Sequence, residues 1–407
     1  MSFMTFDYDV AIIGGGPIGS TLAYKLAKEG YNVSILEKKK KIGIPLQCAG
    51  IVSKKLRDFN EIPDELILNE VNGAYLHSAN HMLKVEKDKT EALIIDRVGY
   101  DQFLANRAIG AGVKLFNQHK VIDVDCEKGL ITCQNNEKLS AKVIVGADGS
   151  KSFVSSLFNK KFDYFNASQY LIEVKDFEDN NGIKKTIDFQ NKETKFVDLF
   201  AISEILPGFL WCIPTSNNIF RVGLFSKNSY KEQKKVLNDF LTNEKRFKEI
   251  NIIEKYNGKI PIFNKEKKFV YKRVLLIGDA ASQLKPTTGG GLILGFDTCN
   301  LAKDAIIKSL NKNNISFLEE YEKNFKKKYS KELSYQIKVQ QTIESLSDND
   351  LDYMFTKLKE KNAEEIISKY GDMDKQSVLV KEFIKRGLIF SILPKVFFRK
   401  LISIWNF

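Results

Sequence analysis

The fold is decided by residues 10–19, which read Val-Ala-Ile-Ile-Gly-Gly-Gly-Pro-Ile-Gly. The apolar run predicts a buried strand, and the glycines that follow have the GxGxxG spacing of a dinucleotide-binding turn. Gly14 allows the tight turn, Gly16 lets the backbone approach a pyrophosphate, and Gly19 lets the next helix pack closely on the sheet. Pro17 begins that helix, whose free N–H groups and positive dipole end face the phosphates.

A second apolar run, residues 33–36, ends at Glu37. An amphipathic helix is predicted between the two runs, so strand, turn, helix and strand follow one another in register. A carboxylate at position 37 can accept both hydroxyls of an adenosine ribose, and its charge would repel a 2′-phosphate. The unit therefore favours FAD or NAD over NADP.

Composition and charge exclude several classes of protein. The chain has 407 residues, which is enough for two or three domains with a large core. Its formal net charge of +12 comes largely from lysine clusters such as 38–41, 265–268 and 326–328. These clusters fit a solvated surface or a partner-facing one. No cluster is interleaved with aromatic residues, so nucleic acid is not an expected partner.

The five cysteines and three histidines point to a reducing compartment without a metal site. The cysteines lack paired spacing and no signal peptide is evident, which predicts a cytoplasmic protein. No histidine stands near a cysteine with metal-ligand spacing, so neither a structural zinc nor a Ser-His-Asp hydrolase is expected.

The pattern along the chain predicts an α/β protein with a Rossmann-like FAD-binding domain, an inserted antiparallel sheet domain and a helical C-terminal region. A helix is expected over 97–110, short strands near 113–116, 121–126 and 129–133, and a buried strand before Ala147-Asp148-Gly149. Alternating aromatic segments (186–189, 196–201 and 220–225) indicate the inserted sheet, and a long helix is expected from 291 to 308. The expected parts are 1–155 and 269–320 for the FAD-binding domain, 156–268 for the substrate domain and 321–407 for the helical region.

Three predicted strand ends carry chemistry: the glycine turn, Ala147-Asp148-Gly149 and Gly278-Asp279. Parallel sheets bind ligands at the carboxyl ends of their strands, so one extended cofactor can touch all three. Asp279 can hold a ribose or ribityl hydroxyl. The run Pro286-Thr287-Thr288-Gly289-Gly290-Gly291 starts a helix whose amides stabilise negative charge, as on the N1–C2=O locus of a reduced flavin. This favours a flavin over a nicotinamide.

Together these motifs resemble the FAD-binding fold of the para-hydroxybenzoate-hydroxylase type over roughly the first 310 residues. The resemblance implies that an arginine, here Arg97, lies by the pyrophosphate. Asp148 either lies near the approach of a nicotinamide donor or is purely structural. The implied FAD-binding residues are Gly14, Gly16, Pro17, Gly19, Glu37, Cys48, Ala49, Arg97, Asp279, Gly289, Gly290 and Gly291.

Within that superfamily the chain more closely resembles the geranylgeranyl reductases, which saturate isoprenoid double bonds. Residues 45–51, Pro-Leu-Gln-Cys-Ala-Gly-Ile, are similar to their active-site Pro-x-x-Cys segment. Residues 209–214, Phe-Leu-Trp-Cys-Ile-Pro, are similar to their aromatic-x-Trp-x-Phe-Pro segment, although Ile213 replaces the usual Phe. The same segment also fits the Trp-x-Trp-x-Ile-Pro signature of flavin-dependent halogenases except at Phe209. A monooxygenase or halogenase is therefore the alternative.

The resemblance implies that Cys48 lies near the isoalloxazine and gates substrate or assists proton delivery. Its other interpretation is a small buried hydrophobe, the usual fate of a free cysteine. Phe209, Trp211 and Pro214 are the expected substrate-binding residues, because an isolated alkene is positioned best in a dry apolar channel. Aromatic strands are also ordinary core.

The C-terminal tail, residues 381–407, interleaves apolar side chains with lysine and arginine and ends near Trp405. Its apolar runs are too short to span a bilayer. They fit an interfacial helix on anionic lipid, or a helix docked on the protein's own surface.

The expected protein is thus an FAD-dependent reductase of geranylgeranyl lipid chains, peripheral on the inner face of the cell membrane. Its partners would be a prenylated lipid, the membrane surface and an electron donor, NAD(P)H or ferredoxin. A non-enzymatic lipid-carrier or flavin-storage module is the remaining class.

Overall fold

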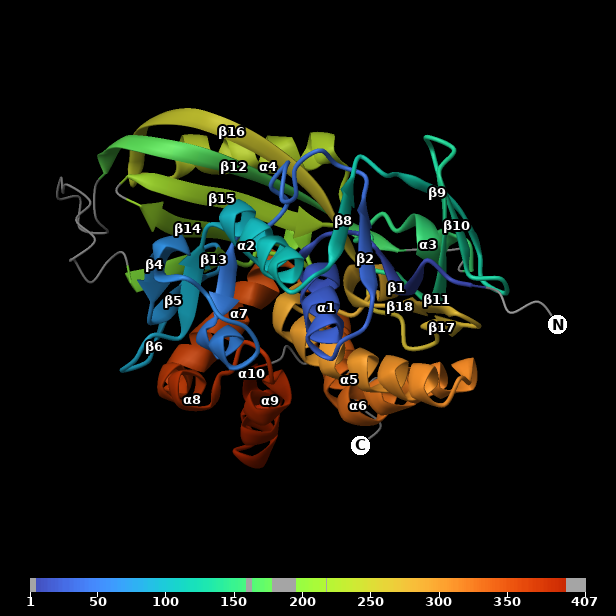
Figure 1. Ribbon diagram of the computed structural model, residues 1–407. Coiled ribbons are helices and arrows are strands. Elements are labelled where there is room, and N and C mark those ends of the chain that lie inside the picture. Colours follow the sequence, from blue (N-terminus) through green and yellow to red (C-terminus); the bar gives the residue numbers. More distant parts are fainter. Residues whose placement is uncertain (1–4, 159–162, 178–194, 217, 393–407) are drawn as a thin grey trace.

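The glycine turn follows the central strand of a mostly parallel sheet. Figure 1 shows the computed structural model, which describes residues 5–158, 163–177, 195–216 and 218–392. The order of the sheet is β17-β18-β11-β1-β2-β8, and β9 and β10 extend it from β11. These strands are β1 (Tyr8–Ile13), β2 (Val33–Glu37), β8 (Lys114–Asn117), β9 (Val121–Asp125), β10 (Leu130–Cys133), β11 (Lys138–Gly146), β17 (Val270–Tyr271) and β18 (Val274–Leu276).

The register of this sheet brings the predicted strand ends to one edge. Ile13 lies opposite Leu36 of β2 and opposite Gly146 of β11. Gly146 lies opposite Leu276 of β18. All four strands are parallel, so the loops that follow them leave the sheet at the same level. The expected convergence of the glycine turn, residues 147–149 and Gly278-Asp279 is therefore present.

Helices cover both the sheet and the loops at its edge. In the chain, α1 contacts α2 and α5, and α5 contacts α6. Their buried faces close a core around β1 and β11 that is built from Val, Ile, Leu and Ala side chains. These helices are α1 (Pro17–Lys28), α2 (Arg97–Gly110), α3 (Phe153–Ser156), α5 (Leu292–Asn311) and α6 (Glu319–Ile343), with short 3-10 helices η1 (Lys54–Asp58), η2 (Asp64–Leu66), η4 (Ser203–Ile205), η5 (Gly278–Ala281) and η6 (Ile315–Leu318).

A second sheet occupies the top and the left-hand side of Figure 1, with the first sheet at the right, and has the order β16-β12-β15-β14-β13-β5-β6. It is antiparallel except for the parallel pair β13 and β5. Helix α4 (Tyr230–Asn243) covers the face that carries Val222 and Leu224. The strands are β5 (Gly73–His77), β6 (Met82–Glu86), β12 (Tyr164–Phe177), β13 (Phe196–Phe200), β14 (Leu210–Ser216), β15 (Ile219–Ser226) and β16 (Phe247–Pro261).

This sheet draws on more of the chain than the sequence pattern indicated. β5 and β6 come from residues 73–86, which the sequence assigned to the FAD-binding part, because strand partners far apart in sequence leave no local signal. The expected strand at 186–189 lies outside the described residues. A third sheet has the order β3-β7-β4, and its strands, β3 (Ile51–Ser53), β4 (Ile67–Val71) and β7 (Ala92–Ile95), flank β5 and β6 in the sequence.

The C-terminal region is helical, as expected. It comprises α7 (Asp348–Glu360), α8 (Ala363–Tyr370), α9 (Gln376–Lys385) and α10 (Leu388–Ile392). Ile389 and Ile392 are buried with Phe355 of α7 and Leu83 of β6. The described part of the tail therefore packs on the protein's own body, while residues 393–407 lie outside the described residues. Within the described chain, no helix is long and apolar enough to cross a membrane.

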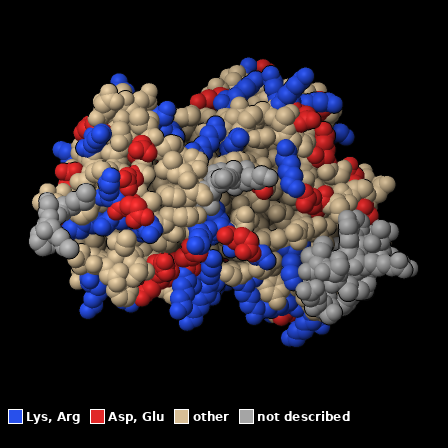
Figure 2. Space-filling view, turned by 90° about the vertical axis from the view of Figure 1, so that its right-hand side faces the viewer, with Lys and Arg blue, Asp and Glu red and all other residues tan. Residues whose placement is uncertain are grey.

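The lysine clusters are interspersed with acidic side chains. On the face shown in Figure 2, Lys and Arg are spread among Asp and Glu. In the cluster at 326–328, Lys326 pairs with Glu322 at 2.7 Å and Lys328 with Asp297 at 2.6 Å. Exposed pairs of this kind contribute only about 0–1 kcal/mol each.

Candidate functional site

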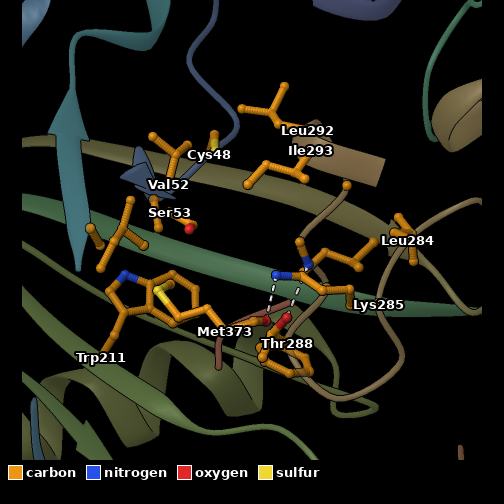
Figure 3. A pocket seen from close by; sticks show the side chains of 18 of the residues that line it. Cys48, Val52, Ser53, Trp211, Leu284, Lys285, Thr288, Leu292, Ile293 and Met373 are labelled. Carbon is orange, nitrogen blue, oxygen red and sulfur yellow. Dashed lines mark hydrogen bonds between the residues drawn. The ribbon is translucent and has the colours of Figure 1, made fainter. Parts of the chain in front are cut away.

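One cavity of about 890 Å³ connects the edge of the parallel sheet with the second sheet and the C-terminal helices. Its lining includes Gly16 and Glu37 from the first βαβ unit and Trp211 from β14. It also includes Ile392 of α10, more than three hundred positions further along the chain than Gly16. Figure 3 shows the region where the cysteine loop, β14 and the start of α5 face one another.

The three glycines of the motif differ in what a side chain at each position would contact. Gly14 has φ +110°, and a β-carbon there would lie 2.4 Å from the carbonyl oxygen of Ala147. A β-carbon on Gly19 would lie 2.1 Å from the carbonyl oxygen of Gly14. Both are therefore required by the close approach of strand, helix and loop. A β-carbon on Gly16 would meet nothing within 4 Å, and this position faces the cavity. The protein itself does not need glycine at position 16, whereas a ligand seated there would.

Glu37 holds the glycine turn. One carboxylate oxygen accepts the backbone N–H of Gly15 at 2.9 Å, and the other accepts that of Lys39 at 2.8 Å. The side chain is buried and borders the cavity. Each carboxylate oxygen can accept a further hydrogen bond, so the predicted contact with a ribose remains open to this residue.

Arg97 and Asp279 are two charged residues that line the cavity, Arg97 buried and Asp279 partly so. Arg97 donates to Asp101 at 2.9 Å, while its Nε has no hydrogen-bond partner in the described structure. No described residue donates a hydrogen bond to the Asp279 carboxylate, and burial raises the pKa of Asp279 to about 6, partly offset by the charge of Arg97. Both groups have unused hydrogen-bonding capacity toward the cavity.

The segment before α5 provides a further wall. Gly289, Gly290 and Gly291 line the cavity, and α5 begins at Leu292 rather than at the expected 291. Gln340 of α6 donates to the carbonyl of Pro286 at 2.5 Å, which fixes this loop from behind. The N-terminus of α5 therefore presents its free N–H groups and positive dipole end to the cavity.

Lys285 in the same loop joins it to the connection between α8 and α9. Its Nζ donates to the carbonyl of Met373, as drawn in Figure 3, and to Asp374, each at 2.8 Å. Lys55 forms a second ion pair to this connection, with Asp372 at 2.5 Å. Met373 thereby lies over the cavity near Trp211. Neither Lys285 nor Met373 was predicted from the sequence.

Cys48 borders the cavity at the loop that precedes β3. The N–H of Gly50 donates to its sulfur at 3.4 Å, and Arg97 lies near enough for the two groups to interact electrostatically. The thiol is partly exposed and free. Ala49 also lines the cavity, so the loop predicted to cover a flavin is placed where it can do so.

The aromatic segment of β14 is divided between wall and core. Phe209 and Trp211 line the cavity, and their rings meet edge to face at 6.2 Å. Pro214 is buried outside the cavity lining, where its carbonyl accepts from Asn69 at 3.1 Å. Alternation along the strand accounts for this division: Trp211 and Ile213 share the face that lines the cavity, and Pro214 points to the opposite side.

Asp148 caps α3. Its carboxylate accepts the hydroxyl of Ser152 at 2.5 Å and the N–H of Phe153 at 2.6 Å. Of the two interpretations considered, these contacts support the structural one. Two other polar residues were missed: Gln169, which lines the cavity, and Arg221, which contacts the loop that carries Cys48. Arg221 is the one charged residue of β15, and that is the signal that points to it. Gln169 lies among several polar residues of β12, so its strand gives no comparable signal.

The residues present fit an FAD. The open side of Gly16, the unpartnered Nε of Arg97, the free carboxylate of Asp279 and the exposed end of α5 all face one cavity. Together they would hold the pyrophosphate, the ribityl chain and the isoalloxazine of an FAD along the parallel sheet edge. A bound FAD would give hydrogen-bond partners to polar groups that have none in the described structure.

Beyond Cys48 and Trp211 the cavity becomes apolar. The walls come from the second sheet and from the chain after residue 330, and they combine many apolar side chains with polar ones such as Lys87, Thr342 and Gln376. The apolar lining residues are Leu76, Val85, Val339, Ile343, Met354, Ile367, Leu379, Val380, Phe383, Ile389 and Ile392.

Comparison with known proteins agrees with these features. Residues 7–331 match the family model described as FAD binding domain. The digeranylgeranylglycerophospholipid reductase of Methanococcus vannielii is 29% identical over 376 residues, which cover 88% of this chain and 92% of that protein. The geranylgeranyl bacteriochlorophyll reductase-like protein of Thermoplasma acidophilum superimposes with a TM-score of 0.80 at 22% identity, covering 97% and 98% of the two chains.

A halogenase also has a similar fold, with a lower TM-score. The halogenase PltM, in a crystal structure with FAD, gives a TM-score of 0.65 at 18% identity and covers 93% of this chain and 84% of its own. Both solved structures bear on the fold alone.

Proposed function

The chain belongs to the FAD binding domain family, and from this premise we propose that it is an FAD-dependent reductase that saturates isoprenoid double bonds of a membrane lipid. The observation that carries the proposal is the shape of the cavity, in which the cofactor loops open directly into a long apolar arm. An oxidoreductase that acted on a polar metabolite would not need such an arm. Similarity to the archaeal reductase supports the same class of substrate.

Bound and reduced, an FAD supplies a hydride from its N5 position. The glycine turn, Arg97 and Asp279 would hold it along the sheet edge, with the end of α5 favouring the negative charge of its reduced form. Glu37 keeps the turn in place through the N–H groups of Gly15 and Lys39.

The apolar arm performs the positioning. An isolated alkene offers no carbonyl to polarise, so the chain must hold the double bond rigidly and exclude water. Trp211 and Phe209 from β14, with Met373 from the opposite side, form walls where the arm meets the cysteine loop. A prenyl chain threaded between them would present one double bond at a time.

Cys48 is the group that we assign to proton delivery. As the hydride adds to one alkene carbon, the thiol S–H bond breaks and its proton forms the new C–H bond at the other carbon. The sulfur keeps the electron pair and regains a proton from water. The positive charge of Arg97, which interacts electrostatically with the sulfur, stabilises the negative charge left on it.

Anaerobic turnover tests the proposal. The purified FAD-loaded protein is reduced and mixed with a geranylgeranyl lipid without oxygen, and the oxidised flavin absorbance and the mass of the lipid are followed. We expect reoxidation of the flavin and a gain of one hydrogen pair for each double bond saturated. Lipid of unchanged mass would refute the reductase. Rapid oxygen consumption by the reduced protein with an added aromatic substrate would instead support the monooxygenase or halogenase alternative.

The partners belong to the same proposal. The donor would be NAD(P)H or ferredoxin, and the lipid would be withdrawn from the inner face of the cell membrane. Testing each donor for anaerobic flavin reduction distinguishes them.

A further inference from the structure

Arg221 is a buried charge in the middle of the second sheet. It lies on β15 between Phe220 and Val222, and only 5% of its surface is exposed. Side chains alternate along a strand, so Arg221 shares a face with Gly223 and Phe225, which pack on the Trp211 side. The neighbours Phe220 and Val222 point into the opposite core under α4. Arg221 is therefore directed toward the flavin side of the sheet.

Its guanidinium holds the cysteine loop. The Nη1 atom donates to the carbonyl of Ala49 at 2.9 Å and to that of Ile95 at 3.2 Å. Ile95 ends β7, two residues before Arg97. One side chain of the second sheet thus joins the loop that carries Cys48 to the strand that leads into α2.

The loop is shaped around this guanidinium. Gly50 has φ +74°, and a β-carbon there would lie 1.9 Å from Nη1 of Arg221 and 2.9 Å from the carbonyl oxygen of Ile95. Any side chain at position 50 would therefore displace the guanidinium from both carbonyls. The contacts of Arg221 with the two carbonyls therefore depend on glycine at position 50.

The charge of Arg221 has no counter-charge. No carboxylate in the described structure pairs with it, and its Nε is buried without a hydrogen-bond partner. Burial lowers the pKa of Arg221, and the charge of Arg97 acts in the same direction, whereas Cys48, Asp96 and Tyr256 oppose it. Asp96 uses its carboxylate to cap α2 through the N–H groups of Val98 and Gly99. Arg97, by contrast, is paired with Asp101.

An unpaired buried charge is costly, and the cost falls when a negative group comes near. The group expected beside the Ala49 loop is the flavin, which is anionic when it is reduced by two electrons. We propose that Arg221 is a positioning residue that fastens the Cys48 loop and supplies the unneutralised positive charge that favours the reduced, anionic flavin. The inference rests on the flavin site of the proposed function but not on the lipid substrate.

The reduction potential of the bound FAD is the direct test, because a purely structural residue would not move it in a charge-dependent way. It is measured anaerobically at pH 7.5 with reference dyes on the FAD-loaded protein, for the wild type, Arg221→Gln, Arg221→Lys and the surface control Arg57→Gln. For Arg221→Gln we expect the equilibrium constant for two-electron reduction to fall about tenfold, a potential about 30 mV more negative. Arg57→Gln should match the wild type, since Arg57 is half exposed and pairs only with the exposed Asp64.

Arg221→Lys distinguishes the effect of the positive charge from the effect of the hydrogen bonds that hold the Cys48 loop. Lysine keeps the charge, but its side chain is shorter and does not bring its nitrogen to the position from which Nη1 of Arg221 reaches both carbonyls. We expect its potential to stay near the wild-type value while Cys48, followed by peptide mass after iodoacetamide treatment, is alkylated several-fold faster in both variants. An unchanged potential in Arg221→Gln would overturn the proposal.

A potential that falls equally in the lysine and glutamine variants would also overturn it, because charge would then not be the cause. If Arg221→Gln does not fold, the lysine variant alone decides: a potential near wild type with faster alkylation supports the proposal, and a lowered potential contradicts it. None of these readouts requires lipid turnover, so failure of the lipid assay and failure of this inference are distinguishable.

Discussion

The indole Nε1 of Trp211 donates a 3.0 Å hydrogen bond to the side-chain oxygen of Gln169. The amide nitrogen of Gln169 donates in turn to the carbonyl oxygen of Cys48 at 3.4 Å. One glutamine on β12 therefore connects the aromatic wall of the cavity with the cysteine loop. The two segments that most closely resemble the geranylgeranyl reductases, far apart in the sequence, meet through a residue that belongs to neither.

Replacing Gln169 by leucine should remove the connection between Trp211 and the loop that carries Cys48. The change leaves the buried indole N–H without an acceptor, which costs about 1–3 kcal/mol of unfolding free energy. We expect turnover to fall about tenfold or more, since small misplacements of reacting groups have large effects. Urea unfolding and steady-state rates measure the two effects, with the exposed Gln134→Leu as the matched control. Wild-type rates in Gln169→Leu would contradict the connection.

Gly16→Ala and Gly19→Ala should have different effects, the first on FAD binding and the second on stability. Alanine at position 16 fits the protein, whose backbone there has φ −69°, but its methyl group occupies the cofactor's place. We expect a folded protein of unchanged stability that binds FAD at least tenfold more weakly, measured by titration of the flavin-free protein. Gly19→Ala, which clashes with Gly14, should lower the unfolding temperature instead. Equal FAD affinity in Gly16→Ala and the wild type would exclude the assigned cradle.

Asp279 makes stability depend on pH in the flavin-free protein. Burial raises the pKa of Asp279 from 3.8 to about 6, so the folded state holds the proton more tightly than the unfolded state. Its contribution to the unfolding free energy is therefore fully present below about pH 4, falls as the pH rises to about 6 and is constant above. Asp279→Asn should remove this fall, raising the unfolding free energy at pH 7 by about 3 kcal/mol.

The same variant should bind FAD more weakly, because a carboxylate accepts a hydroxyl hydrogen bond more strongly than an amide does. Urea unfolding at pH 4.5 and 7.5, without and with FAD, gives both quantities. An asparagine variant that is less stable than the wild type at both pH values would refute the buried, unpartnered carboxylate.

Cys48→Ala should dissociate catalysis from cofactor binding. The thiol borders the cavity, and its removal takes away the proposed proton source without disturbing the loops that hold FAD. We expect the flavin spectrum to be retained and kcat to fall at least tenfold, in line with the usual worth of a general acid. Cys126→Ala, a partly exposed thiol outside the cavity lining, is the control. Should both variants turn over at the wild-type rate, Cys48 has no role in proton delivery.

The apolar arm should discriminate by chain length. Leu76 of β5 lines it beside the C-terminal helices, and Leu76→Trp narrows the passage there. We expect KM for a geranylgeranyl substrate to rise about tenfold while KM for a single prenyl unit stays unchanged, because only the long chain reaches this depth. Leu68→Trp on the exposed side of β4 serves as the control for a general loss of stability. If Leu76→Trp changed KM equally for both substrates, the geranylgeranyl chain would not pass Leu76, and its place in the apolar arm would be refuted.

Much of the cofactor site follows from local sequence. The glycine turn, the acid at position 37 and the Gly-Asp turn at 278–279 each follow a run of apolar residues, and parallel pairing brings such strand ends together. The sequence could not show that Glu37 already accepts two backbone N–H groups, nor that Asp148 caps α3. Those contacts depend on the conformation of loops, and loop conformation leaves no periodic pattern in the sequence.

The substrate side was predicted less completely. The Trp211 segment and the cysteine loop were identified through resemblance, while Gln169, Arg221 and Met373 were not. Each of these three is a single residue whose role depends on partners from other strands and helices. The inclusion of β5 and β6 in the second sheet has the same origin, since their neighbour β13 lies more than a hundred residues further along the chain.

The sequence by itself determined that this chain binds a dinucleotide in a parallel α/β sheet, because turn geometry and strand periodicity act over a few neighbouring residues. The tertiary structure decided what the cofactor faces. It placed an unpaired arginine behind the Cys48 loop, linked Trp211 to that loop through Gln169 and closed an apolar arm with helices from the end of the chain. Burial and long-range contacts set these relationships, and they exist only once the distant segments have packed together.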